Sequence, residues 1–286
     1  MVLDASLPPT LLDVPARVDE VLRIALGARR AELASIDPAA TEPIDEVIRL
    51  VEAGGKRVRP CLCYWGFRAA GGSDGDPILR AAAALELLHT MALIHDDVMD
   101  ASTRRRGVAA VHVHQADRAS SRGEVDPARI GVAVAILAGD LAAVLADGLF
   151  LDSGFEAERL TNALTRYQRM RVEMAAGQYL DLVDADVDAR RLAQLKGGAY
   201  TVRWPLSIGA ALAGASDETE IALERFAEPL GQAFQLADDL RDGDARPGVD
   251  HDAVRALVAE ARATLASAPL DPVAIRAMDA LAAVIG

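Results

Sequence analysis

LRAAAALELLHTMALIHDDVMD, residues 79–100, joins an apolar run to three aspartates within five residues. The alanines and leucines at its start are strong helix formers. Asp96 and Asp100 are four residues apart and would share one face of that helix, where like charges destabilise it. A hard cation would offset this repulsion, because Mg²⁺ binds carboxylate oxygens. The stretch therefore predicts a long helix that ends in a metal site.

The same pattern recurs as Asp238-Asp239-Leu240-Arg241-Asp242, at the end of a second apolar stretch. One cluster of this kind could be a solvated helix end. Two copies of D-D-x-x-D, each closing an apolar helix, favour metal binding instead. Facing clusters on two helices could hold several Mg²⁺ ions around one diphosphate, whose charge the metals would balance.

The positive charge of the chain is concentrated in a few places. The net charge is −13, which argues against general nucleic-acid binding, and Lys56 and Lys196 are the only lysines. Gly54–Pro60 (GGKRVRP) and Arg104–Arg106 could bind phosphate groups, since guanidinium groups suit bidentate contact with phosphate oxygens. Either cluster could also be a solvated loop.

Apolar residues precede each aspartate cluster, for example Leu85 and Leu88 before the first and Phe234 and Leu236 before the second. A polar mouth above an apolar shaft between helices would suit a ligand with a diphosphate head and a hydrocarbon tail. Each of these residues could also be ordinary core, and His89 could be a hydrogen-bonded core histidine.

The composition indicates one all-α domain over residues 1–286. The 286 residues are 51% hydrophobic and only 4% aromatic, which favours closely packed helices over a β-sandwich. No strand alternation, repeat or long linker is visible. We expect helices over residues 18–33, 44–53, 61–70, 79–100, 128–151, 156–184, 189–213, 217–242, 250–267 and 272–284, with residues 1–15 extended and 101–127 irregular.

Neither a membrane span nor a signal peptide is expected. Asp140 and Asp147 interrupt the longest apolar stretch, Ile130–Leu151, so we interpret it as a helix in the centre of the core. Met1–Pro9 has no basic flank and no apolar run. Cys61 and Cys63 are too close for an ordinary disulfide and too few for a zinc site, as in a protein of the reducing cytoplasm.

Taken together, the motifs resemble those of the trans-polyprenyl diphosphate synthases, the farnesyl and geranylgeranyl diphosphate synthase type. The matching segments follow the order of that family along most of the chain, and YTVRWPL (200–206) looks most like actinobacterial members. The segments are GGKRVRP (54–60), LLHTMALIHDDVMD (87–100), RRG (105–107), AGD (138–140), GQYLDL (177–182), KGGAYTVRWPLSIGAALAG (196–214) and GQAFQLADDLRD (231–242).

The resemblance implies an isoprenoid synthase helical bundle with a central apolar shaft, normally a homodimer. It also implies a reaction in which isopentenyl diphosphate condenses with an allylic diphosphate (dimethylallyl, geranyl or farnesyl). Three Mg²⁺ ions per active site would bind the allylic diphosphate and help it to leave. The double bond of isopentenyl diphosphate would then attack the allylic cation, and a proton would be lost.

The resemblance also assigns roles to the residues of this chain that match the family's motifs. Asp96, Asp100 and Asp238 would bind Mg²⁺, with Asp97, Asp239 and Asp242 in support. Arg105, Lys196 and Gln235 would hold the allylic diphosphate. Isopentenyl diphosphate would be held by Lys56, Arg59, His89 and Arg106. The reaction centre would be lined by Gln178, Asp181, Tyr200 and Phe234.

Two departures from the family pattern stand out. Gly197 replaces a threonine that often follows the helix lysine, and the segment Gly243–Val249 is short, with no lysine after Lys196. Arg241 or Arg246 could replace the missing lysines as phosphate contacts. The departures keep one alternative open, a non-catalytic regulatory subunit of a heteromeric synthase. A second alternative, a class I terpene cyclase, is disfavoured by the second aspartate cluster and by GGKRVRP.

Product length should depend on the residues four and five positions before the first aspartate. Bulky aromatics there close the shaft early in the family, whereas this chain has Ala92 and Met91. We therefore predict a product longer than farnesyl diphosphate, with twenty-carbon geranylgeranyl diphosphate the first choice.

Overall fold

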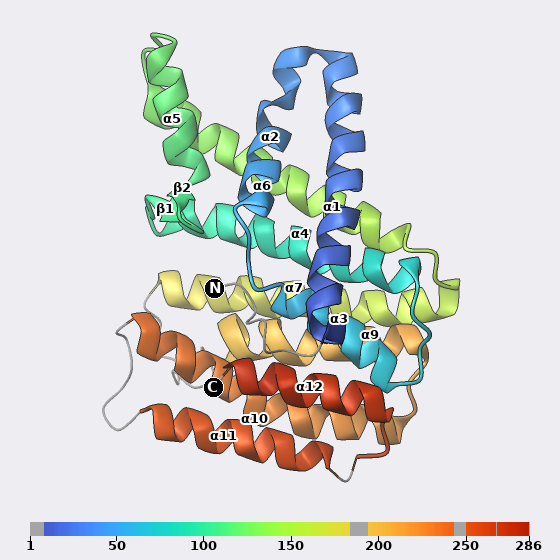
Figure 1. Ribbon diagram of the computed structural model, residues 1–286. Coiled ribbons are helices and arrows are strands. Elements are labelled where there is room, and N and C mark those ends of the chain that lie inside the picture. The colour runs from blue at the N-terminus through green and yellow to red at the C-terminus, as the bar shows by residue number, and fades with distance from the viewer. Residues whose placement is uncertain (1–8, 184–193, 243–249, 267, 286) are drawn as a thin grey trace. The chain divides into compact units, whose positions relative to one another are not determined.

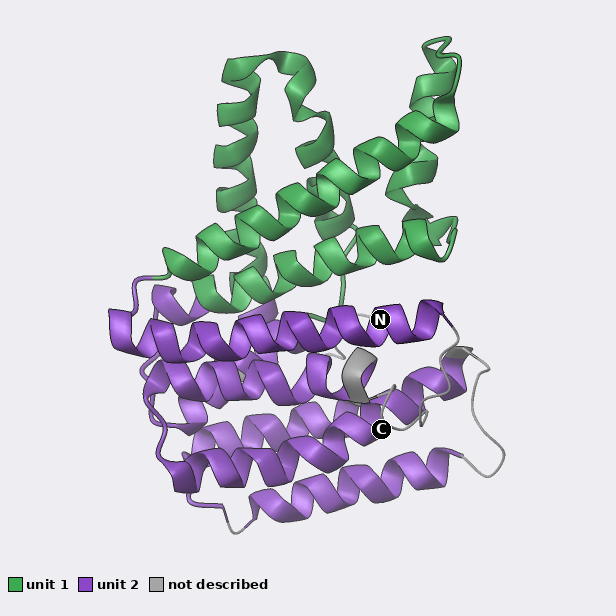
Figure 2. Ribbon diagram, turned by 180° about the vertical axis from the view of Figure 1, so that it is seen from behind, with its two compact units in different colours: residues 1–2, 16–57, 80–153 green, residues 3–15, 58–79, 154–286 purple. Residues whose placement is uncertain are grey.

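The computed structural model describes residues 9–183, 194–242, 250–266 and 268–285, and nearly all of them are helical (Figure 1). The prediction of an all-α fold is confirmed. The chain divides into two compact units (Figure 2). Unit 1 comprises residues 1–2, 16–57 and 80–153, and unit 2 comprises residues 3–15, 58–79 and 154–286. A single polyprenyl synthase domain over residues 1–286 stays a prediction.

The elements follow one another along the chain with short connections. They are α1 (Pro9–Ile36), η1 (Pro38–Thr41), α2 (Glu42–Glu52), α3 (Val58–Ala69), α4 (Asp76–Met99), β1 (Arg104–Arg105), β2 (Val108–Ala109), α5 (Val111–Ser121), α6 (Pro127–Leu151), α7 (Ala157–Leu182), η2 (Gln194–Arg203), α9 (Trp204–Ala213), α10 (Asp217–Asp242), α11 (His251–Leu265) and α12 (Pro272–Ile285).

The expected irregular stretch 101–127 was wrong, because it contains a small hairpin and helix α5. β1 pairs antiparallel with β2, and Arg105 lies opposite Val108. The two-residue turn between them has positive φ at both positions, 51° at Arg106 and 80° at Gly107, as a type I′ turn requires. The two strands have two residues each, which is too short for an alternation of apolar and polar residues to be visible in the sequence.

Two other boundaries differ from expectation. α1 begins at Pro9 and continues through Pro15, where an extended segment was expected. The helix expected over 189–213 is two elements within the described residues, the π-helix η2 and then α9, which has a proline at its start. Proline there removes a backbone donor, and π-helical turns often mark functional sites.

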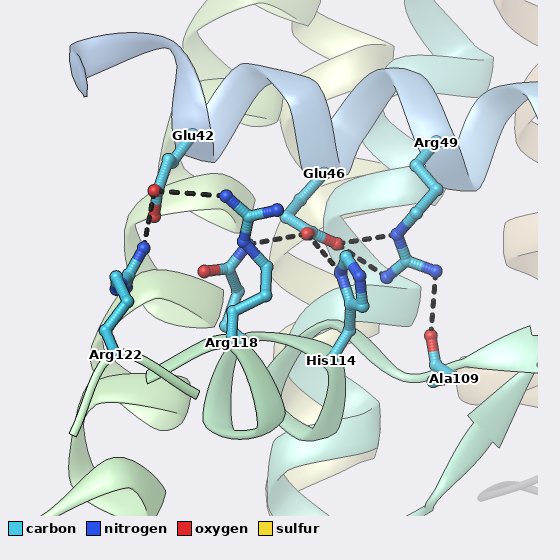
Figure 3. Close-up of polar contacts among 8 residues, drawn as sticks. Glu42, Glu46, Arg49, Ala109, His114, Arg118 and Arg122 are labelled. Carbon is cyan, nitrogen blue, oxygen red and sulfur yellow. Dashed lines mark hydrogen bonds and ion pairs between the residues drawn. The ribbon is translucent and has the colours of Figure 1, made fainter. Parts of the chain in front are cut away.

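A buried carboxylate in unit 1 joins α2 to α5 (Figure 3). Glu46 is 2% exposed, and its Oε1 accepts a hydrogen bond from Gln115 Nε2 at 2.6 Å and lies 2.6 Å from His114 Nδ1. Arg49 donates to Glu46 Oε2. Nearer the surface, Glu42 pairs with Arg118 and Arg122 of α5. These contacts fix the position of α5 on α2.

α6 is not the central core helix that its composition suggested. Asp126 caps its start by accepting a hydrogen bond from Arg129 N at 3.1 Å. One face carries small buried residues, including Ala135, Ala142 and Ala146. The other face is exposed and apolar. We call this side the exposed apolar face of α6. It comprises Val132, Ile136, Leu137, Val144 and Leu151.

By length and composition alone, α4 and α6 could each cross a membrane. The apolar window of α4 is 67% buried in the protein, as in the core helix of a soluble protein. The window of α6 is 33% buried, which the exposed apolar face explains. A membrane or the surface of another protein could cover such a face, and both would select the same hydropathy.

Unit 2 relies on close helix crossings. A Cβ on Gly66 of α3 would lie 2.4 Å from the Leu206 carbonyl oxygen of α9, and one on Gly209 would lie 2.0 Å from the Cys63 carbonyl oxygen. Only glycine lets the two backbones approach this closely. The prediction of closely packed helices with few aromatics is therefore confirmed here.

Candidate active site

The first aspartate motif occupies the end of α4 in unit 1. Two backbone hydrogen bonds form at the end of this helix. Asp100 N donates to the Asp96 carbonyl at 2.8 Å, and Ser102 N donates to the Asp97 carbonyl at 3.0 Å. Arg105, on β1, donates from Nε to Asp97 Oδ1 at 2.8 Å and from Nη2 to Asp96 Oδ2 at 3.1 Å. One guanidinium therefore bridges two of the three aspartates.

Asp97 is the buried member of this motif. Its side chain is 1% exposed, and burial raises its pKa, while the hydrogen bond from Arg105 acts in the opposite direction. Within the described part of the chain, Asp97 Oδ2 is buried and has no hydrogen-bond partner. A desolvated carboxylate oxygen is unfavourable unless a cation or a donor satisfies it. The motif therefore fits a bound cation.

The second motif occupies the last turns of α10 in unit 2. Gln235 Nε2 donates to Asp239 Oδ1 at 2.6 Å, one helical turn along. Arg241 pairs with Asp238 on the same helix, and both side chains are partly exposed. A phosphate contact by Arg241 stays a prediction. The side chains of Asp242 and Lys196, and all of Arg246, lie outside the described residues.

Gly197 explains how Gln235 is placed. A Cβ on Gly197 would lie 1.6 Å from Gln235 Oε1 and 2.8 Å from its Cδ. The amide of Gln235 therefore occupies the space that a side chain at position 197 would need. The neighbouring pair Gly198 and Gly231 lets η2 and α10 approach backbone to backbone, since a Cβ on Gly198 would lie 2.8 Å from the Gly231 carbonyl oxygen.

The predicted isopentenyl diphosphate ligands fall in both units. Lys56, His89 and Arg106 belong to unit 1, and Arg59 belongs to unit 2. Arg59 donates from Nη2 to Thr201 Oγ1 at 2.7 Å, and its guanidinium carbon lies 4.5 Å from the centre of the Tyr200 ring. Arg59 and the predicted reaction-centre residue Tyr200 are therefore in contact, as a cation–π pair.

The other predicted residues differ in exposure. Asp100 and Asp181 are exposed, and partly exposed side chains are found at Met91, Ala92, His89, Gln178, Phe234, Asp238 and Asp239. Partial exposure is suited to side chains that meet a ligand.

Among the described residues, no group of three or more His, Cys, Asp or Glu side chains is arranged to hold a metal ion. The first motif lies in unit 1 and the second in unit 2. The carboxylate oxygens of both motifs are the hard donors that Mg²⁺ prefers. These oxygens are suitable ligands for Mg²⁺ in a site whose remaining ligands are phosphate oxygens of the substrate.

Sequence reasoning missed three side chains that organise these groups: Arg57, Glu86 and Thr201. Arg57 looked like one more cation of the GGKRVRP segment, yet it is 4% exposed. Glu86 carried a usable signal, because it is the only charged residue between Ala81 and Ile94. A lone carboxylate in an apolar helix needs a partner, and the partner is a guanidinium.

Comparison with known proteins matches these motifs to one family. Residues 41–254 match the polyprenyl synthetase family model. Geranylgeranyl diphosphate synthase of Methanosarcina mazei is 35% identical over 201 residues, which cover 68% of this chain and 56% of that protein. The enzyme of the same name from Mycobacterium tuberculosis is 36% identical over 221 residues, covering 74% of this chain and 57% of that protein. The matches thus span little more than half of these relatives.

A solved structure matches over nearly its whole length. The crystal structure of geranylgeranyl pyrophosphate synthase from Corynebacterium glutamicum, complexed with isoprenyl diphosphate and magnesium, superposes with a TM-score of 0.84 at 28% identity. The match covers 95% of this chain and 98% of that one. The two aspartate motifs, the GGKRVRP segment and the helical architecture lead to the same conclusion: the chain belongs to the polyprenyl synthetase family and has the isoprenoid synthase fold.

Proposed function

We propose that the protein is a Mg²⁺-dependent prenyltransferase that condenses isopentenyl diphosphate with an allylic diphosphate, dimethylallyl, geranyl or farnesyl. The product is a trans-polyprenyl diphosphate, with geranylgeranyl diphosphate preferred. The observation that carries this proposal is the pair of D-D-x-x-D motifs, each in the last turns of a long helix and each beside a polar or cationic partner, Gln235 or Arg105. Family membership supports it.

Asp96, Asp100 and Asp238 would hold Mg²⁺, three ions per site, with Asp97, Asp239 and Asp242 in support. The metal would supply charge stabilisation of the departing diphosphate. Arg105, Lys196 and Gln235 would hold that diphosphate from the protein side. Arg105 already binds Asp96 and Asp97, which supports a role for its guanidinium in stabilising the negative charge of the departing diphosphate.

The second substrate would be held by Lys56, Arg59, His89 and Arg106. The C–O bond of the allylic substrate breaks, and its electron pair stays on the diphosphate. The double bond of isopentenyl diphosphate then forms a C–C bond with the allylic carbon. A proton leaves the adjacent carbon, with the released diphosphate as its acceptor, and restores the double bond.

Water must be kept from the allylic cation during these steps. An apolar shaft would exclude water and accommodate the growing chain, and Met91 and Ala92 would help to set the length of that chain. Gln178, Asp181, Tyr200 and Phe234 would line the reaction centre. The ring of Tyr200 carries negative charge on its face, and Arg59 already uses one side of it.

The direct test incubates the purified protein with Mg²⁺, isopentenyl diphosphate and farnesyl diphosphate, and identifies the product by chromatography. We expect geranylgeranyl diphosphate, and a fifteen-carbon limit would contradict the proposed length. Turnover of an allylic diphosphate that does not require isopentenyl diphosphate would indicate a cyclase. A purified protein that is inactive by itself, and whose activity is restored by a partner synthase, would indicate a regulatory subunit.

Asp96→Ala or Asp238→Ala should lower turnover by roughly 100-fold or more, since even outer-shell partners of metals contribute about 10- to 100-fold. Circular dichroism should show an unchanged helical fold, because both carboxylates are partly exposed. Asp252→Ala is the matched control, as this exposed aspartate lies in α11 outside both motifs. Near-full activity of either variant would refute the assignment of the metal ligands.

We further propose a cytoplasmic homodimer. The exposed apolar face of α6 supports the dimer, because large exposed apolar patches usually mark an interaction surface. A second copy would cover that face without a lipid bilayer.

A further inference from the structure

Glu86 links the two cationic segments that flank the first aspartate motif. This side chain is 2% exposed, and its Oε1 accepts hydrogen bonds from Arg57 Nη1 and from Arg106 Nη2, both at 2.7 Å. Arg57 comes from the GGKRVRP segment, and Arg106 from the turn of the hairpin. One buried carboxylate oxygen therefore holds two guanidinium groups that are distant in sequence.

Both arginines are tied down a second time, to the end of α2. Arg57 Nη2 donates to the Val51 carbonyl at 2.8 Å, and Arg106 Nη1 donates to the Leu50 carbonyl at 3.0 Å. Carbonyl groups in the last turn of a helix lack intrahelical partners and accept such bonds readily. Arg57 also donates to Asp19. Glu86 is therefore the shared point at which α2, α4 and the hairpin turn meet.

The backbone at both arginines supports a positioning role. Arg57 and Arg106 each have a φ of 51°, in the left-handed region that non-glycine residues rarely adopt. At Arg106 the type I′ turn requires this φ, whereas at Arg57 the surrounding contacts hold the residue in it. Gly55 adds a steric condition, because a Cβ there would lie 2.8 Å from Arg57 Nη1 and 3.0 Å from Arg106 Nη2.

The charge balance leaves this cluster suited to an anion. Glu86 and Asp19 balance two of the three positive charges on Lys56, Arg57 and Arg106, which leaves one. Two N–H groups of Arg106 are used by Glu86 and Leu50, out of the five that a guanidinium offers. The side chain of Arg106 is 13% exposed, whereas Arg57 is buried. Arg106 and Lys56 can therefore meet a diphosphate, while Arg57 acts only inside the protein.

We propose that Glu86 is a positioning residue for isopentenyl diphosphate. It holds the guanidinium of Arg106 and, through Arg57, the loop that carries Lys56, so that both are in place before the diphosphate binds. This inference rests on the proposed function and deepens it. The proposal predicts a specific effect on one substrate. Among the described side chains, Glu86 pairs with Arg57 and Arg106, and neither is a predicted ligand of the allylic diphosphate.

The test compares Glu86→Gln with the wild type in steady-state kinetics. Gln keeps the shape and removes the charge. The KM for isopentenyl diphosphate should rise about 10- to 100-fold, because hydrogen bonds to charged groups are the strong ones. The KM for farnesyl diphosphate should change less than threefold. Glu86→Asp, which keeps the charge, should partly restore the KM for isopentenyl diphosphate.

Glu46→Gln is the matched control. Glu46 is also buried in unit 1 and also pairs with an arginine, Arg49, but it joins α2 to α5. Glu46→Gln should lower the melting temperature, but it should not raise the KM for isopentenyl diphosphate selectively over the KM for farnesyl diphosphate. If Glu86→Gln does not fold, Arg57→Lys tests the same link, because Arg57 affects the substrate only through Glu86 and its loop. A Glu86→Gln enzyme with equal changes in both KM values, or with none, would overturn the proposal.

Calorimetric binding of isopentenyl diphosphate separates this inference from the proposed function. A wild type that binds it but forms no product would contradict the prenyltransferase activity alone, and Glu86→Gln should still weaken binding about tenfold or more. A Glu86→Gln protein that binds as tightly as an active wild type would overturn only the role of Glu86. A wild type that does not bind isopentenyl diphosphate would overturn both.

Discussion

At the scale of the residue, the missing side chain at position 197 decides where Gln235 lies. The family often has threonine there, and the sequence marked Gly197 only as a departure. The structure gives the departure a physical meaning, because the Gln235 amide fills the space beside the glycine and donates to Asp239. Gly197 and Gln235 therefore act together to orient Asp239 of the second aspartate motif.

Gly197→Ala should displace Gln235 and break its hydrogen bond to Asp239, because the new Cβ would lie 1.6 Å from Oε1. We expect kcat/KM for the allylic substrate to fall roughly tenfold, as the loss of a charge-assisted hydrogen bond allows. The end of the Gln235 side chain is flexible, so the fold should survive. Steady-state kinetics and a melting curve measure the two effects.

Gly27→Ala is the control, because Gly27 is an exposed helical glycine with no atom near its Cβ position. It should stabilise the protein by up to about 1 kcal/mol and leave kcat/KM unchanged. In a Gln235→Ala background, Gly197→Ala should have no further effect on kcat/KM. An additive loss there would show that Gly197 acts by another route.

At the scale of the element, α6 combines two faces in one apolar helix. The buried face is mostly alanine and glycine, with Leu149 and Phe150 near its end. Its close fit is visible at Gly139, where a Cβ would lie 2.1 Å from His95 Nε2. The exposed apolar face carries larger side chains, such as Leu137 at 57% exposure and Val144 at 65%. The helix therefore packs within its own unit mainly through small residues, while several of its large apolar residues are exposed.

Val144→Asp should weaken a homodimer that covers this face. A charge buried in an apolar interface without a partner is unfavourable, and the dimer dissociation constant should rise roughly 100-fold. Sedimentation equilibrium measures it, and the monomer should stay helical because Val144 is exposed.

Val125→Asp is the matched control, since Val125 is fully exposed in the loop before α6. It should leave the dissociation constant unchanged. A Val144→Asp protein that dimerises like the wild type would place the interface on another surface.

At the scale of the whole molecule, the two aspartate motifs belong to different compact units. Within the described residues, neither unit alone presents three acidic or imidazole groups around one point. Mg²⁺ together with a diphosphate should therefore stabilise the molecule more than Mg²⁺ by itself. The diphosphate would supply the remaining oxygen ligands.

Mg²⁺ and inorganic pyrophosphate together should raise the melting temperature, while Mg²⁺ alone should raise it little. At a ligand concentration 100 times its dissociation constant, the expected stabilisation is about 2.7 kcal/mol, a shift of several degrees. Differential scanning fluorimetry measures it, and EDTA should abolish it. Asp238→Ala should lose the combined shift, and an equal shift with Mg²⁺ alone would indicate a preformed metal site.

Much of the fold could be predicted from local sequence. Helical periodicity placed α2, α7 and α10 to within two residues at each end. The hairpin at Arg104–Ala109 escaped notice because its strands have two residues each, and α5 followed it into the stretch expected to be irregular. The division into η2 and α9 also escaped notice, because π-helical and α-helical turns share the same apolar residues.

By itself, the sequence determined that this protein is all-α, that two aspartate motifs end two of its helices, and to which family it belongs. These features depend on residues close together in the chain, where spacing alone sets which side chains share a helical face. The tertiary structure alone decided that Glu86 binds Arg57 and Arg106, that Gln235 fills the space beside Gly197, and that α6 has an exposed apolar face. Each of these depends on segments distant in sequence, and burial and contact between such segments exist only after the chain has packed.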